Sequence, residues 1–233
     1  MASGKLTRAV LVGASGRMGA AIADVVSREF GGRVAIVATI DKDTAAKFPA
    51  TVEKADAVID VSAPAATEKF LQELGKAKAK VAYVIGCTGW TDAQLKAVHK
   101  YAERGAVVLA PNFSPGVNLF LGLVEQAAPL LAKWGYDVMV HETHHTRKVD
   151  APSGTAKAIV ERLGKMKAQV HATRAGNIVG THEVRFIGPS DILEFSHEAL
   201  DRSIFARGAV MAAQWAHQQP KPGLYSMKEV IFD

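Results

Sequence analysis

A glycine-rich turn near the start of the chain constrains the fold more than any other feature of the sequence. Residues 7–13 form a short apolar run, and residues 20–30 carry apolar side chains at helical spacing. The turn between them has the pattern G-x-x-G-x-x-G over residues 13–19, with Ser15 where the commonest fingerprint has its middle glycine. Such glycines allow a tight turn, a close approach to a pyrophosphate and close packing of helix on strand. The turn therefore predicts a dinucleotide-binding unit, with cofactor contacts expected from Gly13, Ala14, Ser15, Gly16, Arg17 and Met18.

The next predicted strand, residues 33–40, ends in an acidic and a basic residue that bear on the choice of cofactor. Asp41 follows Gly19 by 41 − 19 = 22 residues, close to the roughly 20 expected for the acidic residue that binds the adenosine ribose. A carboxylate at this position favours NAD, whereas Lys42 can pair with the 2′-phosphate of NADP. A polar turn that binds nothing is the alternative for these two residues, and the sequence does not settle which cofactor is preferred.

Strands and helices alternate through the first half of the chain. Apolar runs at residues 55–62, 80–86 and 106–110 predict strands, and residues 67–76 and 92–104 have helical spacing. This order predicts an α/β fold with a Rossmann-type, doubly wound parallel sheet, which binds ligands at the carboxyl ends of its strands. On their own, the two loops at those ends, residues 86–89 and 111–114, fit ordinary turns better than binding loops.

A second domain is expected after a hinge at residues 114–118. A long apolar helix is predicted at residues 118–131, and two alternating segments at 182–187 and 192–197 predict strands. The second domain is therefore predicted to be α+β with an open mixed sheet. We expect a dinucleotide-binding domain over residues 1–114, completed by about 208–233 with a helix at 209–218. Residues 115–207 are expected to form a domain for substrate binding and oligomerisation.

Residues 144–156 concentrate chemical groups in a short segment that follows a strand predicted at residues 135–142. His144 and His145 can transfer protons near neutral pH. The predicted helix start at Ser153, Gly154 and Thr155 offers backbone N–H groups to an anion, and Lys148 adds a positive charge. The combination predicts an enzyme site for an acidic substrate. The alternatives are a structural histidine, since neighbours on a strand point to opposite faces, a simple helix cap and a solvated lysine.

Residues 142–156 closely resemble the signature E-x-H-H-x-x-K-x-D-A-P-S-G-T-A of 4-hydroxy-tetrahydrodipicolinate reductases, and the resemblance extends over residues 10–230. It implies NAD(P)H-dependent reduction of 4-hydroxy-tetrahydrodipicolinate to tetrahydrodipicolinate, with loss of water, in the diaminopimelate route of lysine biosynthesis. It implies that both NADH and NADPH are accepted. The boundary between the two expected domains implies closure over the substrate.

The resemblance also implies roles for individual residues. His144 would be the general acid, and Lys148 would be a proton donor or electrostatic partner. Asp150 would orient the turn without touching the substrate. The residues implied to bind substrate are His145, Lys148, Ser153, Gly154 and Thr155. The residues implied to border the nicotinamide and its ribose are Gly86, Cys87, Thr88, Pro111, Asn112, Phe113 and Ser114.

The chain departs from the family pattern in three places. Cys87 replaces a threonine, and we interpret it as a small buried residue because no base lies beside it in sequence. The segment at residues 166–174 is shorter than in many members, and Asn177 stands where an aspartate is usual. The family pairs such sheets into a homotetramer, so these changes leave a tetramer or a dimer open. His171, His182 and His197 lack metal-ligand spacing, and no metal is assigned.

The composition favours small anionic partners. Lys plus Arg exceed Asp plus Glu by 28 − 23 = 5, with no run of five basic residues, which argues against a nucleic-acid partner. A single cysteine, no apolar leader and no apolar run of bilayer length predict a cytoplasmic protein that does not bind membranes. Another dinucleotide-dependent dehydrogenase, or a cofactor sensor without turnover, is the alternative function.

Overall fold

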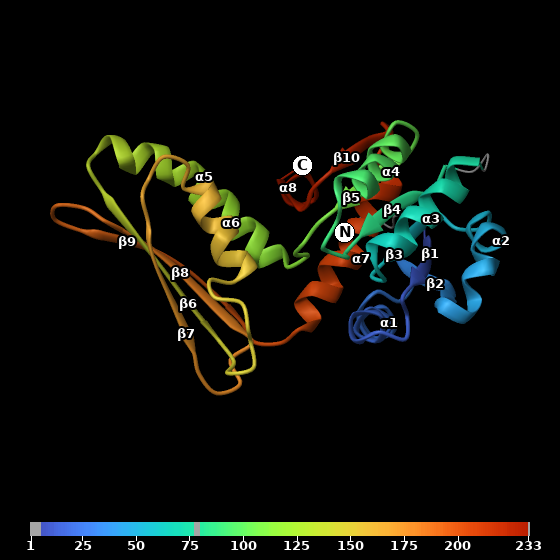
Figure 1. The fold of residues 1–233 in the computed structure, drawn as a ribbon, viewed down its shortest axis with the longest axis horizontal. Coiled ribbons are helices and arrows are strands. Elements are labelled where there is room, and N and C mark those ends of the chain that lie inside the picture. Colours follow the sequence, from blue (N-terminus) through green and yellow to red (C-terminus); the bar gives the residue numbers. More distant parts are fainter. Residues whose placement is uncertain (1–5, 77–79, 233) are drawn as a thin grey trace. The chain divides into compact units, whose positions relative to one another are not determined.

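The computed structural model describes residues 6–76 and 80–232 and divides the chain into two compact units (Figure 1). The first unit combines Met1–Ser114 with Ser203–Asp233, and the second is Pro115–Arg202. Residues 1–5, on which the expectation of a chain without an apolar leader partly rests, lie outside the described residues. Each unit has hydrophobic core residues of its own.

The first unit contains a six-stranded parallel sheet in the order β2-β1-β3-β4-β5-β10. Its strands are β1 (Thr7–Val12), β2 (Val34–Ile40), β3 (Ala57–Asp60), β4 (Ala82–Ile85), β5 (Ala106–Leu109) and β10 (Gly223–Tyr225). The chain passes from β1 to β2 on one side of β1, and the next strand, β3, lies on the other side of β1. The strand order therefore reverses at β1. The predicted doubly wound sheet is confirmed, and its ligand-binding switch point lies where β1 and β3 end.

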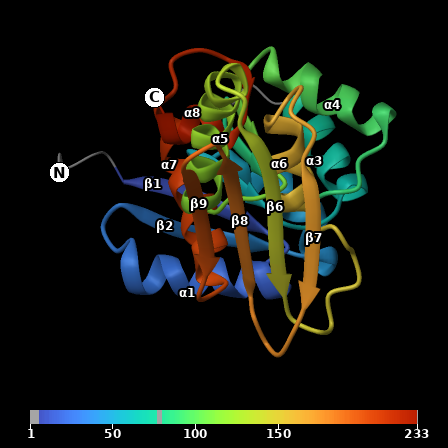
Figure 2. The same cartoon turned by 90° about the vertical axis from the view of Figure 1, so that its left-hand side faces the viewer.

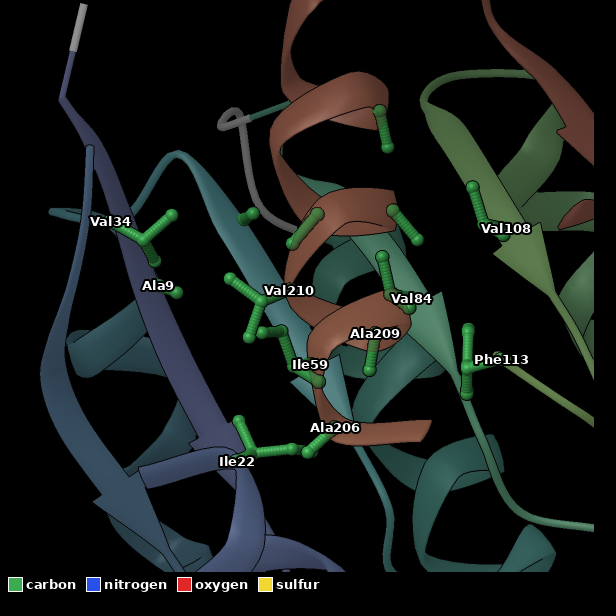
Figure 3. Packing of buried hydrophobic residues seen from close by; sticks show 14 of the residues in the cluster. Ala9, Ile22, Val34, Ile59, Val84, Val108, Phe113, Ala206, Ala209 and Val210 are labelled. Atoms are coloured by element: carbon green, nitrogen blue, oxygen red, sulfur yellow. The ribbon is translucent and has the colours of Figure 1, made fainter. Parts of the chain in front are cut away.

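Helices cover both faces of this sheet. They are α1 (Arg17–Glu29), η1 (Lys42–Lys47), α2 (Phe48–Val52), α3 (Pro64–Lys76), α4 (Asp92–Ala102), α7 (Ser203–Gln218) and α8 (Met227–Phe232). Alternate residues of β1 serve opposite faces, because Leu11 packs in the cluster of α1 and α7 and Val10 packs in that of α2, α3 and α4. Figure 3 shows Ala209 and Val210 of α7 packed over Ile59 of β3. Strands that are apolar on both faces are typical of a buried parallel sheet.

The second unit is an open mixed sheet with both helices on one face. The strands, in spatial order, are β7 (Gln169–Arg174), β6 (Asp137–His144), β8 (Gly180–Ile187) and β9 (Ile192–Ala199) (Figure 2). β6 runs parallel to β7 and antiparallel to β8, which forms a hairpin with β9. The helices α5 (Pro115–Lys133) and α6 (Gly154–Arg162) pack on the sheet through residues such as Val124 and Ile159. The predicted α+β second domain is confirmed.

Several elements differ from the sequence predictions. The strand β7 is a polar edge strand, Gln169–Arg174, and its lack of apolar alternation hid it. The helices α1, α5 and α7 begin at Arg17, Pro115 and Ser203, which is three to six residues before the expected starts at 20, 118 and 209. Their first turns contain glycine, proline or polar residues, which weaken the helical pattern in the sequence.

The helices were also compared with the length and hydropathy of a membrane span. Within residues 6–76 and 80–232, none combines enough length with enough apolar character to cross a bilayer.

Candidate active site

The glycine turn of the first unit has the geometry that a pyrophosphate requires. Gly13 has φ +80°, in the left-handed region that favours glycine. A Cβ at Gly19 would lie 2.2 Å from the carbonyl oxygen of Gly13, so α1 packs against the turn more closely than any side chain allows. Gly16 caps α1, and no acidic residue lies in the first turn of that helix. The start of α1 therefore presents backbone N–H groups to an anion.

Asp41 is bonded to the glycine turn and lines a cavity with it. The backbone N–H and hydroxyl of Ser15 donate to Asp41 Oδ1, at 3.2 Å and 2.8 Å. A cavity of about 700 Å³ is lined by Gly13, Ser15, Asp41 and Lys42, and also by Lys69 of α3. The structure thus brings the predicted phosphate turn and the predicted ribose residues together. Lys69 was missed in the sequence because nothing in its helical pattern distinguishes it from a surface lysine.

The two loops after β4 and β5 also lie against each other. A Cβ at Gly86 would lie 2.8 Å from Cε2 of Phe113, whose ring is buried. The backbone N–H of Ser114 donates to Asn112 Oδ1 at 2.8 Å, which fixes the second loop. Thr88 and Pro111, the other predicted contacts here, are exposed. Both loops follow the carboxyl ends of neighbouring strands, where ligands of parallel sheets bind.

Beneath these loops lies a buried polar network that the sequence did not indicate. The hydroxyl groups of Ser62 and Tyr83 donate to the carboxyl oxygens of Asp60, at 2.6 Å and 2.8 Å. Burial raises the pKa of Asp60. Burial also raises the pKa of the Cys87 thiol to about 11, and Cys87 Sγ lies 3.4 Å from Thr67 Oγ1. A thiol with that pKa stays protonated near neutral pH, which agrees with a small buried residue and not with a nucleophile.

In the second unit, β6 places the signature side chains on the face that the helices cover. Alternation along the strand buries Val140, Glu142 and His144, while His141 and Thr143 point to the other face. The strand reaches His144, two residues beyond the predicted end at 142. His145 follows the end of the strand and is only half-buried. The two adjacent histidines therefore occupy different environments.

Glu142 is fully buried and joins three elements. Its Oε2 lies 2.8 Å from His144 Nδ1, close enough to form an ion pair whenever that ring is protonated. Its Oε1 accepts hydrogen bonds of 2.9 Å from the backbone N–H of Ser153 and from Arg174 Nη2. Burial alone would raise the pKa of Glu142, but the hydrogen bonds from Ser153 and Arg174 and the charge of His144 lower it. The carboxyl group is therefore ionised at neutral pH.

Two histidine rings meet beside this carboxylate. The ring centroids of His144 and His182 lie 5.0 Å apart in an edge-to-face arrangement, and His182 Nε2 lies 3.3 Å from Ser153 Oγ. Burial, together with the charge of His144, lowers the pKa of His182 to about 4. Burial also lowers the pKa of His144, as do the charges of Lys148 and Arg174, while Glu142 acts in the opposite direction. Both rings are therefore neutral at pH 7 in the free protein.

The loop between β6 and α6 carries the remaining predicted residues. Lys148 Nζ lies 2.7 Å from Asp150 Oδ1, and this contact lowers the pKa of Asp150. Asp150 therefore holds Lys148, consistent with the orienting role expected for it. His145 Nε2 lies 3.4 Å from Arg202 Nη2, and burial, with the charges of Arg147 and Arg202, lowers the pKa of His145.

The start of α6 is a side-chain-capped helix N-terminus. Ser153 caps the helix, and its hydroxyl accepts from the backbone N–H of Ala156 at 3.1 Å. Gly154 and Thr155 form the first turn, which contains no acidic residue. The structure thus brings His144 and the helix start together through Glu142. Sequence reasoning missed Glu142, His182, Arg174 and Arg202 as site residues, although Glu142 is the first letter of the signature.

Glu142, His144 and His182 also have the composition of a metal site. One ligand atom from each lies within 4.8 Å of the others, and all three residues are buried. However, the guanidinium group of Arg174 already binds the carboxylate, and Lys148 adds a second cation close enough to lower the pKa of His144. Two neighbouring positive charges oppose a divalent cation. We therefore interpret the two histidines as neighbours of the Arg174–Glu142 ion pair and assign no metal to the trio.

Comparisons with known proteins cover both halves of the chain. A family model described as "Dihydrodipicolinate reductase, N-terminus" matches residues 7–113, and one described as "Dihydrodipicolinate reductase, C-terminus" matches residues 116–231. A curated 4-hydroxy-tetrahydrodipicolinate reductase of Caulobacter vibrioides is 38% identical and covers 95% of each chain. One of Methanocorpusculum labreanum is also 38% identical, over 97% of this chain and 99% of that protein.

Solved structures share the fold at lower identity. The dipicolinate-bound dihydrodipicolinate reductase from Paenisporosarcina sp. TG-14 matches with a TM-score of 0.80 and 20% identity, covering 96% of this chain and 99% of its own. A DAP dehydrogenase of C. glutamicum, in complex with DAP, matches with a TM-score of 0.59 and 12% identity, covering 97% and 94%. At these identities the matches establish the architecture of the chain.

The Rossmann-type unit, its glycine turn and these relatives define an oxidoreductase that uses a pyridine nucleotide. The two family models together span nearly the whole chain, and the curated relatives exceed 30% identity over almost their full length. The chain belongs to the dihydrodipicolinate reductase family, and the resemblance seen in its sequence is confirmed.

Proposed function

We propose that this chain catalyses the NAD(P)H-dependent reduction of 4-hydroxy-tetrahydrodipicolinate to tetrahydrodipicolinate, with loss of water, in the diaminopimelate route of lysine biosynthesis. The observation that carries the proposal is the cluster of Glu142, His144 and Ser153, in which a histidine and an anion-binding helix start share one carboxylate. The named relatives support the same reaction.

His144 is the proposed general acid. The reduced nicotinamide supplies the hydride, and hydride addition to a conjugated imine leaves negative charge on the far atom or the nitrogen. A proton must neutralise that charge, and His144 lies beside the proposed carboxylate-binding helix start. In the free protein burial lowers the pKa of His144, as do Lys148 and Arg174. A substrate with two carboxylates offsets those positive charges, so substrate binding raises the pKa of His144 toward the range of an effective acid.

The substrate carboxylates are proposed to bind at the start of α6 and along the preceding loop. Gly154 and Thr155 lie in the first turn of α6, and a helix N-terminus can bind an anion through its backbone N–H groups and the partial positive charge of the helix dipole. Lys148 supplies a full charge and acts as a proton donor or electrostatic partner. His145 and Ser153 complete the proposed set of substrate ligands.

The first unit is proposed to bind the cofactor, and both NADH and NADPH are proposed to be accepted. The pyrophosphate would lie on the turn at residues 13–18, and the ribose would lie in the cavity beside Asp41 and Lys42. The loops at residues 86–88 and 111–114 would border the nicotinamide. Asp41 favours the ribose hydroxyls of NADH, whereas Lys42 and Lys69 favour the 2′-phosphate of NADPH.

We also propose that the second unit forms a homo-oligomer, a tetramer or a dimer, through the sheet face opposite α5 and α6. That face carries Met139, His141 and Arg185, and helices of this unit pack on the other side of the sheet. Sedimentation of the protein at several concentrations measures the assembly directly. A cytoplasmic location is proposed because the single cysteine, Cys87, suits a reducing compartment.

The reaction is tested by loss of nicotinamide absorbance when the substrate is generated in place. Pyruvate and aspartate semialdehyde are condensed by the preceding synthase, and NADH or NADPH is supplied. Oxidation that requires both precursors supports the proposal and ranks the two cofactors. Cofactor binding without oxidation contradicts the proposed reaction and favours another substrate or a sensing role.

A further inference from the structure

We propose that Glu142 is a positioning residue, which fixes the proton donor His144 and the substrate-binding start of α6 in one geometry. The inference rests on the proposed function, because it assigns Glu142 a part in the same reaction. Glu142 is not proposed to touch the substrate. Its side chain is fully buried, and it acts through the groups that it holds.

The two oxygens of the carboxylate divide their partners between the two functional elements. Oε2 faces the ring of His144 at 2.8 Å, and Oε1 accepts the backbone N–H of Ser153 at 2.9 Å. His144 ends β6 and Ser153 caps α6, and the loop that joins them in sequence is mostly exposed. The carboxylate therefore provides a short, rigid link where the chain itself provides a long, solvated one.

Arg174 completes the arrangement from β7. Its Nη2 donates to Glu142 Oε1 at 2.9 Å and also to the carbonyl oxygen of Asp150. Asp150 in turn pairs with Lys148. A single guanidinium group thus ties the loop that carries Lys148 to the carboxylate that holds His144. Buried ion pairs contribute little net stability because their desolvation is costly. The Arg174–Glu142 pair is therefore better explained by the geometry that it fixes than by the stability that it adds.

The charges around His144 show what Glu142 does electrostatically. The groups that face the ring are Glu142 on its own strand, Lys148 and Asp150 on the loop, Arg174 on β7 and His182 on β8. The two cations disfavour the imidazolium form of His144, and Glu142 is the largest contribution in the opposite direction. Glu142 therefore keeps His144 within reach of protonation as well as in position.

The experiment is Glu142→Gln in the full-length protein, a change that keeps the shape of the side chain and removes its charge. We expect kcat to fall roughly 10- to 100-fold, by analogy with the loss of a carboxylate that orients a metal-binding histidine. The KM for the nucleotide should stay unchanged. The titration midpoint of His144, followed by NMR of 13C-labelled histidine and assigned with His144→Gln, should move to lower pH. Glu142→Asp keeps the charge and should restore part of both properties.

Glu161→Gln is the matched control. Glu161 lies on α6 in the same unit, with an exposed side chain away from the sheet face proposed for assembly. This control should leave kcat and the His144 midpoint at wild-type values.

Several results would overturn the inference. If Glu142→Gln lowers only the melting temperature, Glu142 is merely structural. If kcat falls while the His144 midpoint stays fixed, the proposed link to His144 is wrong. If Glu142→Gln does not fold, the test uses Glu142→Asp, whose side chain is shorter. Wild-type values of kcat, of KM for the substrate and of the His144 midpoint in Glu142→Asp would show that the position of the carboxylate does not matter, and would contradict the inference. Absence of any reductase activity in the wild type, with a shifted midpoint in the variant, would refute the proposed function and leave the contact intact.

Discussion

The carbonyl oxygen of Phe113 occupies the space in which a side chain on Gly208 would begin. A Cβ at Gly208 would lie 1.7 Å from that oxygen and 2.7 Å from the carbonyl carbon. The loop after β5 therefore rests directly on the backbone of α7, within the first unit.

Gly208→Ala should destabilise the protein, because neither the helix nor the loop can yield without moving backbone. Overpacking of this kind costs about 1–3 kcal/mol or more, which thermal or urea unfolding would measure. Gly75→Ala is the control, since a Cβ there meets nothing within 4 Å in helix α3. That change should be neutral or stabilise by up to about 1 kcal/mol. Equal melting temperatures for the two variants would mean that the loop moves freely.

Gly180→Ala should impair turnover by displacing the ring of His144. A Cβ at Gly180 would lie 2.9 Å from His144 Nε2 and 3.1 Å from its Cδ2, so the ring must shift by several tenths of an ångström. Since small misplacements of reacting groups are costly, kcat should fall roughly 10-fold or more. Nucleotide affinity, measured by fluorescence titration, should not change. Gly31→Ala, at a site with open space, is the control. An equal loss of kcat in Gly31→Ala and Gly180→Ala would show that displacement of the His144 ring is not the cause.

His144 should also set the pH dependence of the reaction. Burial lowers its pKa below the ordinary value near 6.5, and the neighbouring cations lower it further, so the protonated acid is lost early as pH rises in the free protein. The bound dicarboxylate is expected to raise that pKa. Because kcat/KM reports the free enzyme and kcat the complex, kcat/KM should decline at lower pH than kcat does. Coincident profiles would contradict this assignment.

His144→Gln should lower kcat by roughly 10²- to 10⁴-fold, the usual contribution of a general acid. Cofactor binding should be unaffected, because His144 belongs to the second unit. His171→Gln, at an exposed position on the edge strand β7, should behave like the wild type. Turnover by His144→Gln at the wild-type rate would remove His144 from the mechanism.

Asp41→Ala should shift the cofactor preference toward NADPH. The carboxylate accepts from Ser15 and lines the cavity that also contains Lys42 and Lys69. Removal of the carboxylate weakens NADH binding, because the ribose hydroxyls lose a hydrogen-bond acceptor. It strengthens NADPH binding, because the negative charge that repels the 2′-phosphate is gone. One charge-assisted hydrogen bond of about 1.5–3 kcal/mol corresponds to roughly 10-fold or more in the ratio of kcat/KM values. Asp24→Ala, at an exposed position on α1 outside this cavity, is the control. An unaltered ratio in Asp41→Ala would make Asp41 a turn residue only.

The fold was predictable because its signals are local. Continuous apolar strands and the glycine turn specify a doubly wound sheet within short windows of sequence, and the structure confirms it. The signature likewise pointed to His144 and to the start of α6. Where prediction failed, as at β7, the strand is polar and is defined by its pairing with β6, which lies far from it in sequence.

The supporting residues of the site were hidden for the same reason. Arg174 lies 174 − 142 = 32 positions from Glu142, and His182 reaches Glu142 only because β8 pairs with β6 in one register. In sequence Glu142 is in phase with Val138 and Val140, so the alternation places it on the same face of the strand as these apolar residues. A carboxylate is seldom fully buried, and only the structure shows the packing of α6 and the partners Ser153 and Arg174 that allow it.

The burial of Cys87 has a practical consequence for studying this protein. At pH 7, a thiol with a pKa of about 11 is ionised in only about one molecule in ten thousand. It is also the single cysteine of the sequence. A cysteine introduced on the surface would therefore react with a maleimide dye or a spin label far faster than the native one. The wild-type chain can serve directly as the background for site-specific labelling, with no need to replace a residue beside the proposed cofactor.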